Sequence, residues 1–272
     1  MEKIVSLAMA EPNAGEQRPV VLLVDDNEEI LDFIGDDLGD NYVILTARNG
    51  TEALAILQQQ IVQLVVSDVM MPGMDGFELC EYIKSGIEFS HIPVVLLTAK
   101  NTLQSKIKGL ELGADVYVEK PFSPEFLQVQ IASLIKNRNN IKTYFASSPL
   151  IHIKSIAYSK ADEQFLGKLQ DAINDNLEDM DLDVDKLADQ LNMSRPTLYR
   201  KIKSISDMSP NELINLARLK RGAELLNEGI LKIYEIAETV GYRSQTHFGR
   251  NFVKQFGMSP TDYLKAQHNK LH

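Results

Sequence analysis

Four short apolar runs in the first half of the chain lead directly into residues that can do chemistry. Asp25-Asp26 follows VVLLV, Asp68 follows LVVS, Thr98 ends VVLLT and Lys120 follows VYVE. If these runs are parallel strands, their carboxyl ends meet at one edge of a sheet. Carboxylates that converge there repel one another, and a hard divalent cation such as Mg²⁺ relieves the repulsion. Asp68 would then be a nucleophile that accepts a phosphoryl group, which Lys120 would neutralise and Thr98 would hydrogen-bond.

The segments around these residues alternate between apolar runs and helical stretches. We expect strands at 20–24, 43–46, 64–67, 94–98 and 116–118, and helices at about 27–39, 50–59, 75–85, 102–111 and 123–137. Unbroken Val, Leu and Ile runs are typical of a parallel sheet that is buried on both faces. The pattern predicts an α/β fold, a doubly wound five-stranded parallel sheet of the flavodoxin-like kind, with its active site at the carboxyl edge.

Four motifs of this half, VLLVDDNEE, SDVMMPGMDGFELC, PVVLLTAK and ADVYVEKPF, occur in order over about 120 residues. They resemble the receiver domain of response regulators. The resemblance implies that Asp68 is the phosphoacceptor and that Asp26 is a direct Mg²⁺ ligand. It also implies that Asp25 acts on the metal mostly through water and that the backbone carbonyl of Met70 completes the site.

The same resemblance implies a two-state pair of residues behind the acceptor. Thr98 would move onto the phosphoryl group, and Tyr117 would rotate inward behind it. The surface made by the fourth helix, fifth strand and fifth helix would change with them, and we expect this change to favour a homodimer when the chain is phosphorylated. The family commonly holds the Lys-Pro bond cis, so we expect a cis peptide at Lys120-Pro121.

Each of these residues also has an ordinary structural interpretation. Asp25-Asp26 could cap the following helix, Asp68 could be a turn residue and Lys120 a surface lysine. Their joint occurrence favours the acceptor site. An aspartate-based phosphatase usually has a second acid two residues after its nucleophile, and that position is Met70, which cannot be a general acid. We therefore expect a substrate of a histidine kinase or histidine-phosphotransfer domain, with at most slow loss of its own phosphate, and not an enzyme.

A junction separates this half from the next. We expect a flexible lead-in at 1–18, a receiver domain at 19–138, a linker at 139–163 and a second domain at 164–272. Asn139-Asn140 and the Ser147-Ser148-Pro149 turn favour the linker. Ile151, Ile153 and Ile156 suggest a short strand or a packed extended segment within it.

From residue 164 the apolar period becomes helical. Helices are expected at about 165–176, 184–191, 195–204, 210–227, 233–240, 245–255 and 260–267. Two stretches, KLADQLNMSRPTLYRKIK and EIAETVGYRSQTHFGRNFVKQFGMSP, resemble one another at a spacing of about 50 residues. In each, a short helix meets a tight turn and a second, Arg-bearing helix, with Ser194 or Ser244 as the expected N-cap. The repeat predicts an all-α domain with two helix-turn-helix motifs.

The second helix of each motif carries hydrogen-bond donors away from its apolar face. The candidate DNA-binding residues are Arg195, Thr197, Tyr199, Arg200 and Lys203 in the first and Gln245, Thr246, His247 and Arg250 in the second, with Lys201 and Lys254 as further cations. Leu198 and Ile202, like Phe248 and Phe252, would face the core. Arg pairs with guanine and Gln with adenine, whereas lysines more often touch phosphates. The arrangement matches a recognition helix in the major groove.

A larger set of residues in this half fits one known pattern. It comprises Leu187-Ala188, Leu198-Tyr199-Arg200, a linking helix over 218–227, Ile236-Ala237, Val240-Gly241-Tyr242, Phe248, Arg250, Phe252, Gly257, Ser259-Pro260 and Tyr263. The set resembles the AraC/XylS DNA-binding domain, which places both recognition helices in successive major grooves on one face of the DNA. Two residues depart from the family. Asp207 stands where it usually has glycine, and Pro196 falls in the first turn of the first recognition helix, where it would contribute shape instead of a hydrogen bond.

Charge is unevenly distributed along the chain. Taken alone, the net charge of -10 argues against nucleic acid, yet residues 1–140 carry about -11, residues 162–189 about -8 and residues 190–272 about +6. An acidic part joined to a basic part indicates two partners of different sign. The acidic stretch 175–189 is either a solvated helix end and loop or a device that discourages non-specific DNA binding before phosphorylation.

These features together predict a transcription regulator controlled by aspartate phosphorylation. Its partners would be a histidine kinase or histidine-phosphotransfer domain and double-stranded DNA, with RNA polymerase as a further candidate. The single cysteine, Cys80, excludes an internal disulfide and fits a reducing cytoplasm, and no apolar run is long enough to span a membrane. SHIPVVLLTAK with NMSRPTLYRKIK resembles the carboxyl-terminal part of hybrid two-component regulators, whose parent chain could be membrane-anchored. The alternative is a phosphorelay or protein-interaction module whose helical domain does not act through DNA.

Overall fold

A computed structural model of the chain describes residues 18–99, 107, 109, 111–147 and 153–268. Its first part contains a sheet of β1 (Val20–Val24), β2 (Val43–Ala47), β3 (Leu64–Asp68), β4 (Val94–Thr98) and β5 (Val116–Glu119). Neighbouring strands are parallel throughout, and their order is β2-β1-β3-β4-β5. The expected doubly wound, five-stranded parallel sheet is confirmed.

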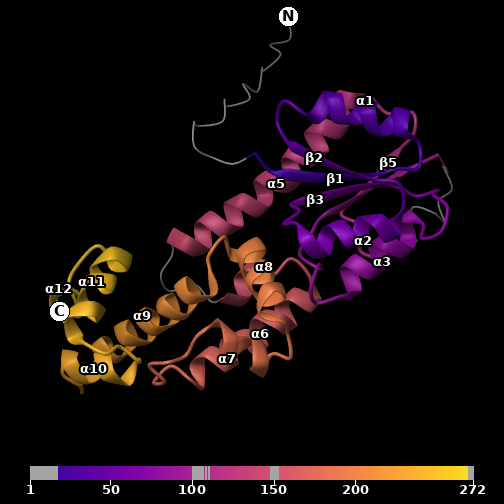
Figure 1. Cartoon of the computed structure of the whole chain (residues 1–272). Coiled ribbons are helices and arrows are strands. Elements are labelled where there is room, and N and C mark those ends of the chain that lie inside the picture. The colour runs from indigo at the N-terminus through magenta and orange to yellow at the C-terminus, as the bar shows by residue number, and fades with distance from the viewer. Residues whose placement is uncertain (1–17, 100–106, 108, 110, 148–152, 269–272) are drawn as a thin grey trace, which may run out of the picture.

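Helices cover both faces of this sheet (Figure 1). They are α1 (Glu28–Leu38), α2 (Gly50–Gln59), α3 (Gly76–Ser85) and α5 (Pro124–Ser147). Successive residues of β1 point to opposite faces. Leu22 and Val24 join the core under α2 and α3, whereas Val21 and Leu23 join the core under α1 and α5. The helix expected at 102–111 lies largely outside the described residues. The lead-in expected at 1–18 lies outside them too, except for Arg18.

The helix α5 is longer than the sequence predicted. It has 24 residues and is therefore about 36 Å long. The expected end near 137 is wrong, because the helix continues through Asn139-Asn140 to Ser147, and the first part of the expected linker is helical. The short strand or packed extended segment expected near Ile153 and Ile156 is packed but not extended: these residues form a 3₁₀ turn, η1 (Ile153–Ile156), and are buried in the core of the helical part. Ile151 lies outside the described residues.

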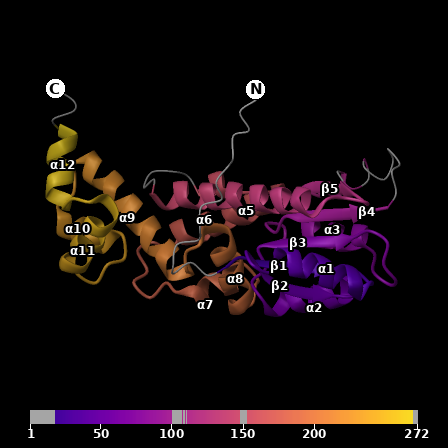
Figure 2. The ribbon, with the colours of Figure 1, turned by 90° about the horizontal axis from the view of Figure 1, so that it is seen from above.

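The second part of the chain is helical, as expected. It comprises α6 (Lys160–Asn174), α7 (Val184–Gln190), α8 (Arg195–Ser206), α9 (Pro210–Glu228), α10 (Ile233–Thr239), α11 (Gln245–Phe256) and α12 (Pro260–His268). The long helix α9 belongs to two cores. Leu213 and Leu216 pack with α6, α7 and α8, while Leu219 and Leu226 pack with α10, α11 and α12. α9 therefore joins two helix-turn-helix units and leads from the receiver side of the molecule to its far end (Figure 2).

The turns and caps of the two units show the repeat in the backbone. The turn before the second helix contains Asn192 (φ 53°) in the first unit and Gly241 (φ 75°) in the second. Ser194 and Ser244 accept hydrogen bonds from the amides of Thr197 and His247, so both expected N-caps are confirmed.

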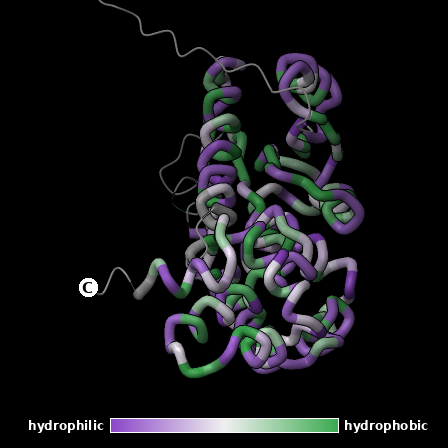
Figure 3. Tube along the Cα trace, turned by 90° about the vertical axis from the view of Figure 1, so that its left-hand side faces the viewer, coloured by the Kyte–Doolittle hydropathy of each residue, from purple (hydrophilic) through white to green (hydrophobic). Residues whose placement is uncertain are grey.

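Hydropathy follows this architecture. Along the helices, hydrophilic and hydrophobic residues alternate in bands (Figure 3), as expected of helices that pack one face on a core. Within the described part of the chain, no helix combines the length and the apolar character that a membrane crossing requires.

Candidate functional site

The residues predicted to form a phosphoryl site meet at the carboxyl edge of the sheet. Lys120 Nζ lies 2.6 Å from Asp68 Oδ1 and 2.9 Å from Asp25 Oδ2. Asp25 follows β1 and is 3% exposed, while Asp68 ends β3 and is 6% exposed. Two buried carboxylates thus share one ammonium, which offsets part of the repulsion between them.

Local backbone structure holds each of these side chains. The Met70 amide donates to Asp68 Oδ2 at 2.7 Å, and the Asn27 amide donates to Asp25 Oδ1 at 3.0 Å. Lys120 is fixed by its own amide, which donates to the Thr98 carbonyl at 2.8 Å, and it precedes a cis bond to Pro121. The expected cis peptide is therefore present in the structure.

A glycine allows the loop after Asp68 to fold back on the strand. A Cβ on Gly76 would lie 2.1 Å from the Asp68 carbonyl oxygen, a distance that no side chain could tolerate. Gly76 begins α3, whose N-cap is Asp75. The close approach therefore brings the start of α3 directly behind the candidate acceptor.

The helix-capping interpretation of Asp25-Asp26 does not hold. The N-cap of α1 is Asn27, whose side chain accepts from the Glu29 amide. Asp25 is turned toward Lys120, and Asp26 is exposed. Asn27 is therefore the residue that caps α1, and the carboxylates of Asp25 and Asp26 are not needed as caps.

Burial dominates the electrostatics of the acceptor. It raises the pKa of Asp68, and the Lys120 hydrogen bond and charge offset only part of that rise. For Lys120, burial acts to lower the pKa, but the hydrogen bonds to Asp68 and Asp25 outweigh it and leave the pKa raised. Lys120 therefore stays protonated over the whole physiological range and can face an incoming anion.

The remaining predicted residues lie close to this cluster. Thr98 is buried at the end of β4, and Tyr117 is half-buried in β5, its neighbouring strand. The ring of Tyr117 packs so closely on Gly109 that a Cβ there would approach it to 3.2 Å. Met70 has an exposed side chain.

The donor set at this edge is suited to a hard cation. The available ligand atoms are carboxylate and carbonyl oxygens, which Mg²⁺ prefers. Two carboxylates, those of Asp25 and Asp68, face one lysine, so the edge keeps a negative charge that a divalent ion would reduce. Within the ranges that the structure describes, no three or more His, Cys, Asp or Glu side chains already converge as metal ligands.

The two candidate recognition helices differ in exposure. On α11 the predicted residues Gln245, Thr246, His247 and Arg250 are all exposed. On α8, Arg195 is exposed and pairs with Asp185 at 2.9 Å, Tyr199 is 43% exposed, and Lys203 donates to the Asp207 carbonyl at 2.6 Å. Thr197 and Arg200 both touch Glu88 of the first domain.

Comparison with known families matches both parts of the chain. The model described as response regulator receiver domain matches residues 21–132, and the one described as helix-turn-helix domain matches residues 187–266. The chain joins a response regulator receiver domain to an AraC-type helix-turn-helix domain. The combination is that of a regulator of transcription.

Several relatives share parts of this arrangement. Histidine kinase P4 of Formosa agariphila is 40% identical over 248 residues, which are 91% of this chain and 18% of that protein. Probable transcriptional regulator ycf27 of Porphyra purpurea is 39% identical over 54% of this chain and 59% of its own length. Chemotaxis response regulator CheY4 of Vibrio cholerae is a solved structure with 33% identity, covering 43% of this chain and 99% of its own, at a TM-score of 0.41. The chain thus spans less than two thirds of either curated relative.

The sequence-based placement of Lys201 among the outward-facing cations of α8 is wrong. Lys201 is 1% exposed, and its Nζ bonds Asp162 of α6 and Ser90 of the receiver. The spacing in the sequence already indicates a buried position, because Lys201 stands three residues after Leu198 and four before Ile205, on the apolar side of the helix. Its partners Asp162 and Ser90 had no local signal, since they are distant in the sequence.

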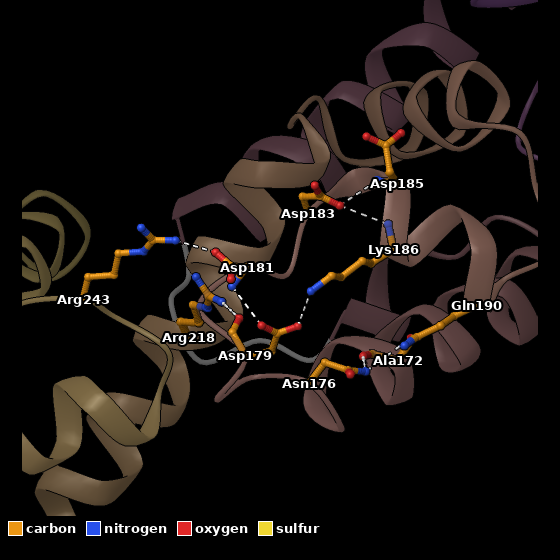
Figure 4. A network of polar contacts seen from close by, with 10 residues as sticks. All are labelled: Ala172, Asn176, Asp179, Asp181, Asp183, Asp185, Lys186, Gln190, Arg218 and Arg243. Atoms are coloured by element: carbon orange, nitrogen blue, oxygen red, sulfur yellow. Dashed lines mark hydrogen bonds and ion pairs between the residues drawn. The ribbon is translucent and has the colours of Figure 1, made fainter.

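The acidic segment between α6 and α7 has partners in both helix-turn-helix units (Figure 4). The Asp179 carboxylate pairs with Lys186 of α7 at 2.6 Å, and its carbonyl accepts from Arg218 of α9 at 2.6 Å. Asp181 pairs with Arg243, which precedes α11. Arg243 was not predicted as a functional residue. The segment is therefore a bridge between the units as well as a solvated loop.

Proposed function

We propose that this chain is a two-component response regulator. Its receiver (19–138) would accept a phosphoryl group on Asp68, and its helix-turn-helix domain (164–272) would bind DNA in a sequence-specific way. The observation that carries the proposal is the Lys120 ammonium between two buried carboxylates, Asp25 and Asp68, at the carboxyl edge of the sheet. A structural ion pair would need only one of these carboxylates.

The proposed reaction is a phosphoryl transfer from a histidine kinase or a histidine-phosphotransfer domain. A carboxylate oxygen of Asp68 forms a bond to phosphorus as the bond from phosphorus to the donor's imidazole nitrogen breaks, and the imidazole keeps the electron pair. Lys120 offsets the charge of the phosphoryl oxygens, and the Thr98 hydroxyl donates a hydrogen bond to one of them. A relative named histidine kinase supports this class of donor.

Receiver domains generally bind Mg²⁺ for phosphorylation. In this chain Asp25, Asp26, Asp68 and the Met70 carbonyl would hold the ion. When bound, the ion supplies positive charge between acceptor and phosphate, which lowers the repulsion between two anions. The exposed Asp26 and the solvent-facing Met70 give such an ion an open approach.

We further propose that Thr98 and Tyr117 pass the phosphorylated state to the surface. They stand on adjacent strands, and Tyr117 packs between the sheet and the segment that contains Gly109. A shift of Thr98 toward a phosphoryl group would leave space behind it for the Tyr117 ring. The change would favour a homodimer and so place two DNA-binding domains on repeated half-sites.

The DNA contacts would come from Arg195, Thr197, Tyr199, Arg200 and Lys203 of α8 and from Gln245, Thr246, His247 and Arg250 of α11. The exposed face of α11 supports this assignment directly. A cytoplasmic location is part of the proposal, because DNA is the target, and RNA polymerase is a further candidate partner.

Labelling by a small phosphodonor tests the receiver half of the proposal. Wild-type protein should take up about one phosphate per chain in the presence of Mg²⁺, and Asp68→Asn should take up none. The matched control is Asp40→Asn, which removes an exposed carboxylate outside the cluster and should label normally. Labelling that persists in Asp68→Asn would refute the assignment.

Binding to DNA at varied salt tests the other half. Affinity should fall steeply as salt rises, because cations of the protein release counterions from DNA. Arg250→Ala should weaken binding to a selected site while leaving the fold intact, since its side chain is exposed. Unchanged footprints in this variant would refute the proposed recognition helix.

A further inference from the structure

The receiver contacts the first recognition helix through the segment between α3 and β4. Glu88 in this segment accepts hydrogen bonds from Arg200 Nη2 at 3.2 Å and from Thr197 Oγ1 at 3.4 Å. The side chains of Arg200 and Glu88 are 25% and 34% exposed. Figures 1 and 2 both place α8 between the receiver and the rest of the helical domain.

A buried polar cluster lies beside this contact. Lys201 Nζ is 3.0 Å from Ser90 Oγ and 3.2 Å from His91 Nδ1, and it also pairs with Asp162. Ser90 in turn donates to Asp162 Oδ1 at 2.7 Å. Ser90 and His91 belong to the receiver, whereas Asp162 lies on α6 and Lys201 on α8, in the helical part of the chain. All four are buried, so the cluster exists only while the two domains are in contact.

Arg200, one of the two covered side chains, lies at the centre of the outward face of α8. Leu198, Ile202 and Ile205 mark its core side, and a helical period of 3.6 residues puts Arg200 nearly opposite to them. Arg200 is therefore the side chain that would enter a major groove most directly.

The internal repeat provides a reference for this arrangement. Arg250 takes the same position in α11 that Arg200 takes in α8, since each is the sixth residue of its helix. Arg250 is exposed, whereas Arg200 is held by Glu88. The two units therefore share one helical design but differ in their access to a ligand.

We propose that the receiver closes over the first helix-turn-helix unit, with Glu88 in the place that DNA would take on Thr197 and Arg200, while the second unit stays open. The inference rests on the proposed DNA-binding function and adds a regulation to it. DNA and the receiver compete for one set of donors, because a carboxylate and a DNA phosphate or base acceptor use the same hydrogen bonds. The closed chain can engage DNA through α11 alone, and full binding requires the receiver to leave α8.

Charge reversal at Glu88 tests this competition in the full chain without phosphodonor. In Glu88→Arg the new cation faces Arg200, so the closed state is destabilised and the affinity for a DNA site selected by this protein should rise about tenfold. Glu81→Arg is the matched control, because Glu81 is exposed on α3 and the substitution changes the net charge equally. It should change the affinity less than about twofold.

A double-mutant cycle separates masking from simple attraction. Arg200→Ala removes a DNA contact but also removes the Glu88 contact that must first be broken, so its effect in the wild-type chain should be about twofold. In the Glu88→Arg background the same substitution should weaken binding about tenfold or more. Equal effects of Arg200→Ala in both backgrounds would overturn the proposal.

A second variant opens the contact without changing charge. Ser90→Phe inserts a ring into the buried cluster between the domains, and its affinity for DNA should rise as that of Glu88→Arg does. If both variants bind DNA like the wild type, the masking is refuted.

If no form of the chain binds DNA specifically, the proposed function fails, and solution X-ray scattering then decides the inference. The radius of gyration should increase in both variants and stay constant in Glu81→Arg, and no increase in either variant would overturn the closed state.

Discussion

Replacing Lys201 by methionine should destabilise the helical domain by several kilocalories per mole. The substitution preserves most of the side-chain volume but leaves Asp162 without its cation. Asp162 is 0% exposed, its Oδ2 atom has no hydrogen-bond partner, and its Oδ1 atom would keep only the Ser90 hydroxyl. The carboxylate would thus be buried and unpaired.

The magnitude follows from the surroundings of Asp162. Removing one partner of a buried ion pair costs about 3–5 kcal/mol. Asp162 lies in the first turn of α6, where the helix dipole stabilises an anion by about 0.3–1 kcal/mol. The expected loss in the free energy of unfolding is therefore about 2–4 kcal/mol. Urea denaturation followed by circular dichroism at pH 7.5 measures it.

Two further proteins make this measurement decisive. Lys201→Met with Asp162→Leu replaces the whole pair by apolar groups and should recover most of the stability, because buried pairs contribute little net free energy. Lys254→Met removes an exposed lysine from α11 and should change the stability by less than about 0.5 kcal/mol. A single variant as stable as the wild type, or a double variant as unstable as the single one, would refute this role of the buried pair.

Three other predictions concern pH, a helix end and the free thiol. Burial lowers the pKa of His91 well below its usual 6.5, with Lys201 adding to the effect, so the unfolded chain gains a proton that the folded chain does not bind. Stability should hold above about pH 6.5 and fall as the pH drops below it, and urea midpoints of His91→Gln should fall less steeply. Asp207→Gly should stabilise the chain by up to about 1 kcal/mol, because Asp207 ends α8 with a φ of 62°, where glycine has no steric cost. Thermal denaturation measures the change, and a lower melting temperature would contradict this prediction. Burial raises the pKa of Cys80 to about 11, so alkylating reagents at pH 8 should label the thiol only when the chain unfolds. The stability that the protonated thiol contributes should be lost as the pH rises from about 9 toward 11. Fast labelling of the native chain would refute the burial of this thiol.

The receiver and its candidate site were predictable because their signals are local. Each strand is an apolar run, and a parallel sheet brings the residue at the end of each run to the same edge. The positions of the apolar runs therefore place Asp25, Asp68 and Lys120 together. The serine caps at Ser194 and Ser244 were predictable for the same reason, since a cap depends on residues within one turn of it.

The junction between the domains was not predictable in the same way. Asn139-Asn140 has low helix propensity, yet α5 continues through it because tertiary contacts override propensity. One such contact is visible nearby, where the Arg138 guanidinium stacks on the Tyr158 ring at 4.2 Å and the Tyr158 hydroxyl donates to the Arg138 carbonyl at 3.0 Å.

The contact that covers the first recognition helix could not be predicted from sequence either. Glu88 and Arg200 are 112 residues apart, and neither neighbourhood indicates the other. The pattern of α8 predicted an outward-facing Arg200, which is correct for the helix taken alone. The docked receiver changes what that outward face meets.

The most direct test of phosphorylation-controlled DNA binding is the affinity of the full chain for a DNA site selected by the protein, measured with and without a small phosphodonor in wild type and in Asp68→Asn. We predict that the phosphodonor raises the wild-type affinity about tenfold or more and leaves Asp68→Asn unchanged. An affinity that does not respond to the phosphodonor in wild type, or that responds equally in Asp68→Asn, would contradict it.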